Sequence, residues 1–322
     1  MSVSEARLLW AVAAPRLWQA LITGWLLATL CFALTHALPG DVALRVAAAR
    51  IGDDRVTAEA AERIRQEEGL GLSVLTQYGT WMMRLAQGDL GRSLVTGTPV
   101  LAEITNHGRY TLVLGTVGWL LSYLIALPLG FWAGCWPGGV VDRLSMGFAV
   151  VLASLPTFLV GIGLISAFAL TLHWLPPAGF KTGAHMVLPA LTLALGLAAY
   201  SMRIVRNAVV EVRQAFYLTF ARIRGHSSVG AFLHHGVRNA AIPIVTFAAL
   251  QFAYLVDGFV IVETLFNYPG LGDLLVRSLL ARDVPVVVGA ALLIGWTYAL
   301  INLAADLACL KLDPRRSMRE AA

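Results

Sequence analysis

Three acidic side chains, Asp257, Glu263 and Asp306, lie in or beside long apolar stretches, where a carboxylate can bind a cation or relay a proton. An ionised carboxylate at the centre of a bilayer costs about 2.5 to 3.5 kcal/mol, so Asp257 is expected to face other helices or water. At the rise of a helix, Asp257 lies roughly 21 Å beyond Pro243. We interpret Asp257 as lining a polar pathway, with a structural hydrogen bond as the alternative. Glu263 and Asp306 lie near the ends of apolar stretches, where solvation or pairing with arginine is expected.

The groups that ATP binding and catalysis require are missing from the sequence. A phosphate-binding loop needs Gly-x-x-x-x-Gly-Lys-Ser/Thr, whereas the only lysines are Lys181 and Lys311, and neither follows a glycine. The apolar stretches do not combine a nucleophile with a base or pair two carboxylates. The cysteines are far apart, and His234 and His235 have no partners at metal-ligand spacing. We therefore expect no catalytic residue, no metal site and no cofactor site.

The composition indicates a membrane protein. Of 322 residues, 58% are hydrophobic and 13% are charged, and the mean hydropathy is +0.72. A soluble domain carries far more charge, so a polytopic protein in a lipid membrane is expected. The net charge of +5 is interpreted through membrane topology, because the chain lacks the soluble basic face that a nucleic-acid partner requires.

Six apolar stretches reach the roughly 20 residues that cross a bilayer as a helix, which predicts an all-α polytopic fold with six transmembrane helices. A cleaved signal peptide is the alternative for the first stretch, but its apolar core would span only about 7 to 15 residues. The predicted spans are 17–38, 111–135, 144–172, 187–207, 243–265 and 285–309.

The distribution of arginines predicts the orientation. When both chain ends are placed in the cytoplasm, most arginines outside residues 39–108 also lie in the cytoplasm. Membrane proteins usually show this excess of basic residues on the cytoplasmic side. The predicted organisation is a cytoplasmic N-terminus with the first span at 1–38 and a large outer loop at 39–108. A core follows at 109–310, with a cytoplasmic loop at 208–242, and residues 311–322 form a cytoplasmic tail.

The outer loop contains two predicted helices. Residues 57–68 are charged and end at Gly69, and residues 88–91, Gly-Asp-Leu-Gly, predict a turn. The loop either docks a partner protein or only covers the helices, and the sequence leaves both interpretations open. Between the charged helix and the turn, an apolar stripe comprises Val74, Leu75, Tyr78, Trp81, Met82 and Leu85.

A strongly basic run at 203–243 lies between two predicted spans. Its apolar side chains recur at helical spacing up to Gly225 and again as far as Pro243, which suits the first turn of a further helix. We predict two short amphipathic helices hinged at Gly225, with a helix lying on anionic lipid as the alternative. The apolar face of the first helix comprises Val212, Phe216, Phe220 and Ile223.

The loop at 263–289, before the last span, contains a predicted turn at Pro269-Gly270 and a second break at Pro285. Between them, leucines at helical spacing predict a short helix whose apolar face points inward. These leucines are Leu271, Leu274, Leu275 and Leu279.

The basic run resembles the EAA loop of ABC importer permeases, in the form found in the dipeptide, oligopeptide and nickel subfamily. An Ala-Arg-x-x-Gly element precedes an Arg-Asn-Ala-x-Ile-Pro element. The resemblance implies a coupling helix that binds a groove on a separate ATPase subunit. The Glu-Ala-Ala that names the loop reads Thr-Phe-Ala here, so no acidic residue begins it. The matching residues are Ala221, Arg222, Gly225, Arg238, Asn239, Ala240, Ile242 and Pro243, and Phe232, between the elements, is assigned to the same loop.

Further matches extend the resemblance over essentially the whole chain. The loop before the last span is similar to the family's Phe-x-x-Pro-Gly-Leu-Gly signature with a downstream Arg-Asp-x-Pro. Pro-Gly-Asp at 39–41 and Leu-Asp-Pro-Arg at 312–315 also match the family. The signature residues are Phe266, Pro269, Gly270, Leu271, Gly272, Arg282, Asp283 and Pro285.

The resemblance implies one permease subunit of an ATP-driven importer in the inner (plasma) membrane of a bacterium. The implied partners are a second homologous permease, two cytoplasmic ATPases and a periplasmic substrate-binding protein. ATP and magnesium belong to the ATPases, so this subunit is expected to bind no cofactor. Residues 211–242 are expected to pass the motion of the ATPases to the membrane helices.

Other functional classes make different demands on the sequence. An ATP-independent secondary transporter is expected to show internal repeats and ionisable relays, and a membrane enzyme needs a catalytic constellation. Neither feature is clear here, and copurification of an ATPase separates these classes from an importer. The implied substrates are dipeptides, oligopeptides or glutathione-like peptides, with nickel or a metal chelate as the alternative.

Overall fold

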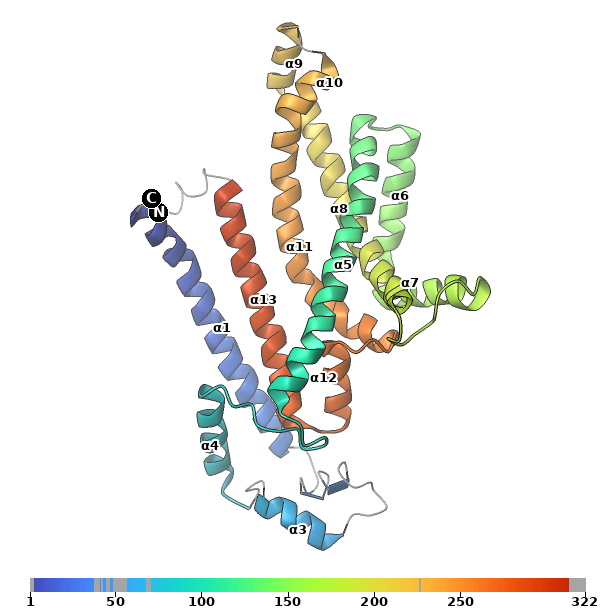
Figure 1. Cartoon of the computed structure of the whole chain (residues 1–322). Helices are drawn as coiled ribbons and strands as arrows, with labels where there is room; N and C mark the ends of the chain where they lie inside the picture. Colours follow the sequence, from blue (N-terminus) through green and yellow to red (C-terminus); the bar gives the residue numbers. More distant parts are fainter. Residues whose placement is uncertain are drawn as a thin grey trace. The chain divides into compact units, whose positions relative to one another are not determined.

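The computed structural model describes residues 3–37, 41, 43–44, 47–48, 57–67, 71–225 and 227–312. Within these residues the regular secondary structure is helical apart from one isolated bridge between Arg92 and Pro99 (Figure 1). The predicted all-α class is therefore confirmed for this part of the chain. The helices divide into two compact units, and three of them run from one unit into the other.

The first unit comprises residues 1–16, 112–268 and 298–322. Its central helix is α8, which packs against α6, α7 and α11. Small buried side chains such as Ala194 and Ala198 let these helices approach closely. Besides most of α5 (Val100–Cys135), the start of α1 and the end of α13, the elements are α6 (Val140–Ser154), α7 (Thr157–Leu164), α8 (Val187–Gln214), α9 (Phe216–Ile223), α10 (Ser228–Ala231) and α11 (Val237–Leu265), with π-helical turns at Ile165–Thr171 and Phe232–Gly236 and a 3-10 turn at Gly183–Met186.

The stretch predicted as one span at 144–172 is bent in the structure. Helix α6 and the helical segment Thr157–Thr171 meet at 108°. Leu155 is extended, and Pro156 caps the start of α7. Proline disfavours a helical conformation in the preceding residue and lacks the amide hydrogen that would continue the helix. The stretch predicted as one span is therefore a bent pair of helices, which can still count as a single broken span.

The second unit comprises residues 17–111 and 269–297. Val100 and Ile104 pack there against Leu271, Val286 and Ala290. The elements are most of α1 (Val3–Ala37), α3 (Ala58–Glu67), α4 (Val74–Ala86), the start of α5 (Val100–Cys135), α12 (Leu271–Leu280) and the start of α13 (Val284–Leu312).

Several helices are longer than the predicted spans. Helix α5 begins at Val100 rather than at residue 111, and α8 continues to Gln214 rather than ending at residue 207. Hydropathy records only the apolar part of a helix, whereas backbone hydrogen bonding continues through its polar turns. In the outer loop, α3, α4 and the turn formed with left-handed Gly88 and Gly91 agree with the prediction.

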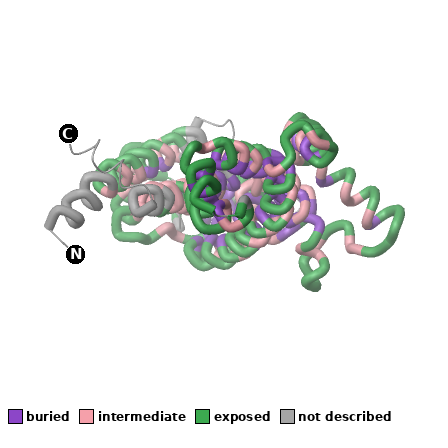
Figure 2. Tube along the Cα trace, turned by 90° about the horizontal axis from the view of Figure 1, so that it is seen from above, coloured by how far each residue is buried: buried purple, intermediate pink, exposed green. Residues whose placement is uncertain are grey.

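Three described helices are long and apolar enough to cross a membrane, and the bent pair counts as a fourth if it forms one span. The three are Val100–Cys135, Gly183–Gln214 and Val284–Ala304. Much of the helical surface is exposed (Figure 2), as expected for helices that face lipid. The count of six spans stays a prediction.

Candidate functional site

The hinged segment, defined here as residues 215–236, joins α8 to α11 in the first unit (Figure 1). Helix α8 ends before Ala215, whose backbone is extended, and α9 follows at once. Gly225 then adopts a φ of +94°, which residues with a side chain rarely adopt. The predicted interruption at Gly225 is thus present, whereas its use as a hinge stays a prediction. Helix α10 and a π-helical turn lead from there into α11.

One face of the hinged segment is anchored to the membrane helices. Leu218 and Ala221 of α9 are buried in a cluster with Val212 of α8. Phe232 packs edge-on against Phe131 of α5, with ring centroids 5.7 Å apart. Phe232 therefore contacts a helix of this chain and also packs against the cluster that holds α9.

The opposite face of α9 is apolar and exposed. Phe216 is 82% exposed, Ile223 76% and Phe220 49%. Arg222 and Arg224 are exposed beside this face, and the Arg224 guanidinium lies 5.3 Å from the centre of the Phe220 ring. Large apolar side chains grouped on one exposed helix face indicate a contact with another protein or with lipid.

Two details of the predicted segment are wrong. The face from Val212 to Ile223 is not one helix face, because the break at Ala215 leaves Val212 buried on α8 and the later side chains turned outward. Pro243 does not begin a helix, because α11 already starts at Val237 and continues through the proline.

The two elements of the predicted coupling motif lie on either side of the hinge. At the end of α9, Ala221 is buried and Arg222 is exposed. Arg238 and Asn239 are exposed in the first turn of α11. The Asn239 side-chain amide donates to the carbonyl of His235 at 2.8 Å, which stabilises the start of that helix.

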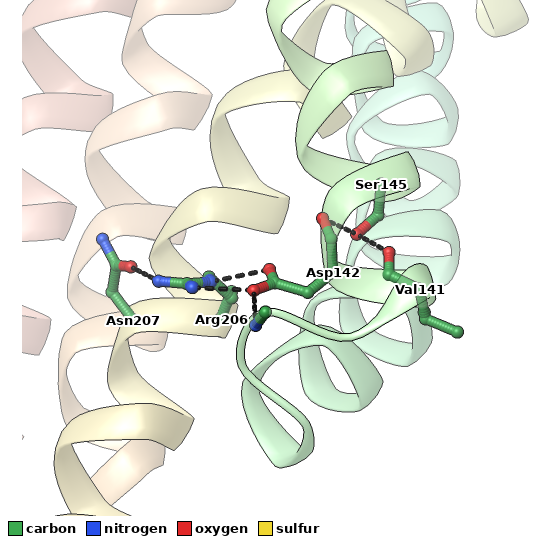
Figure 3. A network of polar contacts seen from close by, with 6 residues as sticks. Val141, Asp142, Ser145, Arg206 and Asn207 are labelled. Carbon is green, nitrogen blue, oxygen red and sulfur yellow. Dashed lines mark hydrogen bonds and ion pairs between the residues drawn. The ribbon is translucent and has the colours of Figure 1, made fainter.

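A bidentate ion pair connects α8 to the start of α6 (Figure 3). Arg206 donates through Nε and Nη2 to the two carboxylate oxygens of Asp142, both at 2.9 Å. The Gly138 amide donates to the same carboxylate at 2.7 Å. Asp142 is only 5% exposed, so these charge-assisted hydrogen bonds offset its loss of hydration. The pair lies about two turns before the end of α8 and positions the start of the hinged segment.

Two glycines bring α5 and α8 into backbone contact. A Cβ atom on Gly130 would lie 2.7 Å from the Val205 Cβ and 2.8 Å from the Met202 carbonyl oxygen. A Cβ atom on Gly134 would lie 2.7 Å from the Val209 Cβ. Small residues four apart are typical of close helix packing in membranes. The spacing of Gly130 and Gly134 could therefore have indicated close helix packing from the sequence alone. The pairing of Asp142 with Arg206 could not have been predicted in this way.

The predicted signature loop is divided between the two units. In the first unit, Phe266 and Tyr268 are buried, and the Gly179 amide donates to the Phe266 carbonyl at 2.8 Å. In the second unit, Gly270 caps α12, as predicted from the turn at Pro269-Gly270. Both parts of the loop are therefore fixed by packing within their own unit.

The start of α12 and the residues after it are anchored inside the second unit. Gly272 is buried, and the neighbouring Leu271 amide donates to Thr111 Oγ1 at 2.7 Å. Buried Asp283 accepts hydrogen bonds from the Ser93 hydroxyl and, at 3.1 Å, from the Leu94 amide.

Two other residues of this loop are exposed. Arg282 has an exposed side chain and a left-handed backbone, with φ +57°. Leu279 is also exposed, so its predicted inward orientation is wrong, and Ser278 takes the buried position. A helical repeat of leucines predicts a helix. It does not show which of the leucines the rest of the chain covers.

The acidic residues beside the apolar stretches have different surroundings. Asp306 forms an ion pair with Arg16 at 2.9 Å, which confirms the predicted pairing with arginine. Glu263 is fully buried, which excludes solvation and leaves the predicted pairing with arginine as the open alternative. Asp257 belongs to α11, but its side chain lies outside the described residues, as do Pro39, Gly40 and the tail at 313–322. Within the described chain, no group of three or more His, Cys, Asp or Glu is placed to hold a metal ion.

Known proteins share both the sequence pattern and the fold. Residues 126–318 match the family described as binding-protein-dependent transport system inner membrane component. The chain is 37% identical over 292 residues to the glutathione transport system permease protein GsiC of Escherichia coli K12, covering 91% of this chain and 94% of that protein. It is 38% identical over 285 residues to the protein of the same name from Pectobacterium atrosepticum, covering 88% and 92%. A crystal structure of an amino acid ABC transporter with histidines matches with a TM-score of 0.52 and 15% identity, over 66% of this chain and 94% of that chain.

Proposed function

This chain belongs to the family of binding-protein-dependent transport system inner membrane components, and we propose that it forms the pathway through which an ATP-driven importer moves small peptides. It is an ABC importer permease subunit that catalyses no reaction itself, because ATP is hydrolysed on a separate ATPase. We infer that the chain pairs with a second homologous permease, binds the ATPase through one exposed surface, and carries substrates of the peptide class.

The exposed apolar face of α9 is the observation that carries the proposal. Phe216, Phe220 and Ile223, with arginines beside them, have the composition of the buried core of a protein interface. A groove on a cytoplasmic ATPase is the surface that covers them. The opposite face of α9 is buried against α8, so closure of two ATPases displaces the membrane helices.

Truncating the exposed face tests this contact. Phe216→Ala with Ile223→Ala removes apolar area from the exposed side and leaves buried Leu218 in place. Loss of an interface anchor costs about 2 kcal/mol or more, or about 30-fold in affinity. The double variant is therefore expected to reach the membrane, to lose copurification of the ATPase in mild detergent, and to lose uptake.

Thr219→Ala is the matched control, because Thr219 is exposed on the same helix. This variant is expected to keep both the ATPase and uptake. If the double variant also retained the ATPase at the level of the unmodified chain, α9 would not be the docking helix.

Small peptides are the substrate class that the relatives favour, since GsiC is named as a glutathione transport permease over nearly the full length of both chains. We infer that a periplasmic binding protein delivers dipeptides, oligopeptides or glutathione-like peptides to the pathway formed with the second permease. Uptake of labelled glutathione and labelled dipeptides by cells that express the complete importer is expected to exceed uptake of nickel. Uptake of nickel alone would reject the peptide assignment while leaving the importer assignment intact.

A further inference from the structure

Helix α4 lies beside α1 within the second unit (Figure 1). The Tyr78 hydroxyl and Thr29 Oγ1 are 2.8 Å apart, and the Trp81 ring stacks on Phe32 with centroids 5.6 Å apart. Met82 and Leu85 of α4 join the same apolar cluster. One side of α4 is thus fixed to the C-terminal half of α1.

The surface of α1 at this level is apolar. No Asp, Glu, Lys or Arg occurs between Leu17 and Ala37. Thr29 lies eight residues before the end of the helix at Ala37, or about 12 Å at the rise of an α-helix. Large apolar side chains of α1 are exposed on this stretch, among them Leu21, Trp25, Leu26 and Leu30. A surface of this composition is stable in contact with acyl chains and costly in contact with water.

The remaining surface of α4 is divided into two sectors. At 100° per residue, one sector next to the α1 contact is apolar and continues the apolar surface of α1. Leu75 is 82% exposed and Met83 67% exposed in this sector. The adjoining sector, on the side of α4 away from α1, is polar and exposed, and it comprises Ser73, Thr76, Thr80, Arg84 and Gln87.

We propose that α4 is an interfacial membrane helix whose Leu75 and Met83 side chains lie in the acyl chains of the leaflet around α1. An apolar sector beside a polar one is the pattern of amphipathic helices at a membrane surface, which bury their apolar face about 5 to 10 Å deep. Arg84 extends from the polar sector toward the head groups. The inference places a helix of the outer loop in lipid, and it is independent of the substrate and of the ATPase contact proposed above.

Spin labels on single cysteines test the proposal in the assembled importer in lipid nanodiscs, without the binding protein. The native Cys31, Cys135 and Cys309 are replaced by serine. Labels at Leu75→Cys and Met83→Cys are expected to collide with oxygen and to be shielded from the water-soluble relaxation agent Ni-EDDA. Matched labels at Thr80→Cys and Gln87→Cys on the same helix are expected to show the reverse preference.

Two other outcomes overturn the proposal. Collision of all four labels with Ni-EDDA places α4 in water. Shielding of the Leu75 and Met83 labels from both agents shows that a protein, rather than lipid, covers this face. Neither outcome affects the assignment as a permease, because the labels report immersion whether or not transport occurs.

A second measurement does not depend on labelling. Leu75→Glu removes little packing within the chain, because the side chain is mostly exposed. It is expected to lower the thermal midpoint in nanodiscs, whereas Thr80→Glu, in the polar sector, is expected to leave the midpoint unchanged. Equal effects of the two variants would contradict an apolar sector in lipid.

Discussion

At the scale of single residues, Gly225 and the ion pair of Asp142 with Arg206 shape the two ends of the region around α9. The glycine sets the direction in which the chain leaves α9, through a backbone that other residues avoid. The ion pair holds α8 in register with the start of α6, close to where α9 begins. One left-handed glycine and one buried carboxylate therefore add to the packing that holds α9 against the membrane helices.

Gly225→Pro is expected to abolish uptake while the protein stays in the membrane. Proline fixes φ near −65°, so it cannot adopt the +94° found at this position. Gly225→Ala forces a left-handed backbone at a cost of about 1 to 2 kcal/mol and is expected to weaken uptake partially. Uptake assays normalised to the amount of protein in the membrane measure both effects. Normal uptake by the proline variant would show that the hinge is not used.

Asp142→Asn is expected to destabilise the chain, because Arg206 then loses a charged partner. The expected cost is about 2 kcal/mol, below the range for fully buried pairs because the arginine side chain is partly exposed. Arg206→Gln should cost a similar amount, and the double variant less than the sum of the two single variants. Thermal unfolding in detergent gives the three values. Strict additivity would show that the two side chains do not stabilise each other.

At the scale of elements, α5 and α8 pack closely against each other next to the hinged segment. Gly130 and Gly134 remove the side chains that would hold the helices apart, and Phe131 between them packs on Phe232. Under the proposed function, we expect this close-packed contact to transmit a displacement of α9, because close-packed interiors have low compressibility.

Gly134→Ala is expected to lower stability by about 1 to 3 kcal/mol, since its methyl group overlaps the α8 side chain and backbone. Gly147→Ala on α6 is the matched control, because a Cβ atom there meets nothing within 4 Å. Alanine is also the better helix former, so the control variant should be neutral or slightly more stable. The thermal midpoints of the two variants measure this difference in stability. Equal midpoints would contradict the close approach of α5 and α8.

Local sequence signals predicted those elements that local chemistry determines. The interruption at Gly225, the turn before α12 and the charged helix α3 follow from glycine, proline and helical spacing. Proline at residue 156 permits a kink, but the size of the bend, 108°, could not be predicted because hydropathy is the same on both sides of it. The exposed face of α9 was assigned to a longer helix, since the break at Ala215 carries neither glycine nor proline. The Asp142 ion pair spans 64 residues and depends on tertiary packing.

At the scale of the whole molecule, the chain is a permease subunit that supplies membrane helices and leaves ATP hydrolysis to a partner. The proposed ATPase contact requires α9 to lie on the cytoplasmic side, which the distribution of arginines also predicts. The contact further requires the exposed apolar face of α9 to be covered in the assembled importer.

The sidedness of α9 tests this account most directly. A single cysteine at Ile223→Cys, with the native cysteines replaced by serine, is treated with a membrane-impermeant maleimide in inside-out and right-side-out vesicles. The account predicts labelling only in inside-out vesicles, and loss of that labelling when the ATPases are assembled on the permease. Labelling of Ile223→Cys in intact right-side-out vesicles would contradict the account, because α9 would then lie on the side of the membrane that lacks ATP.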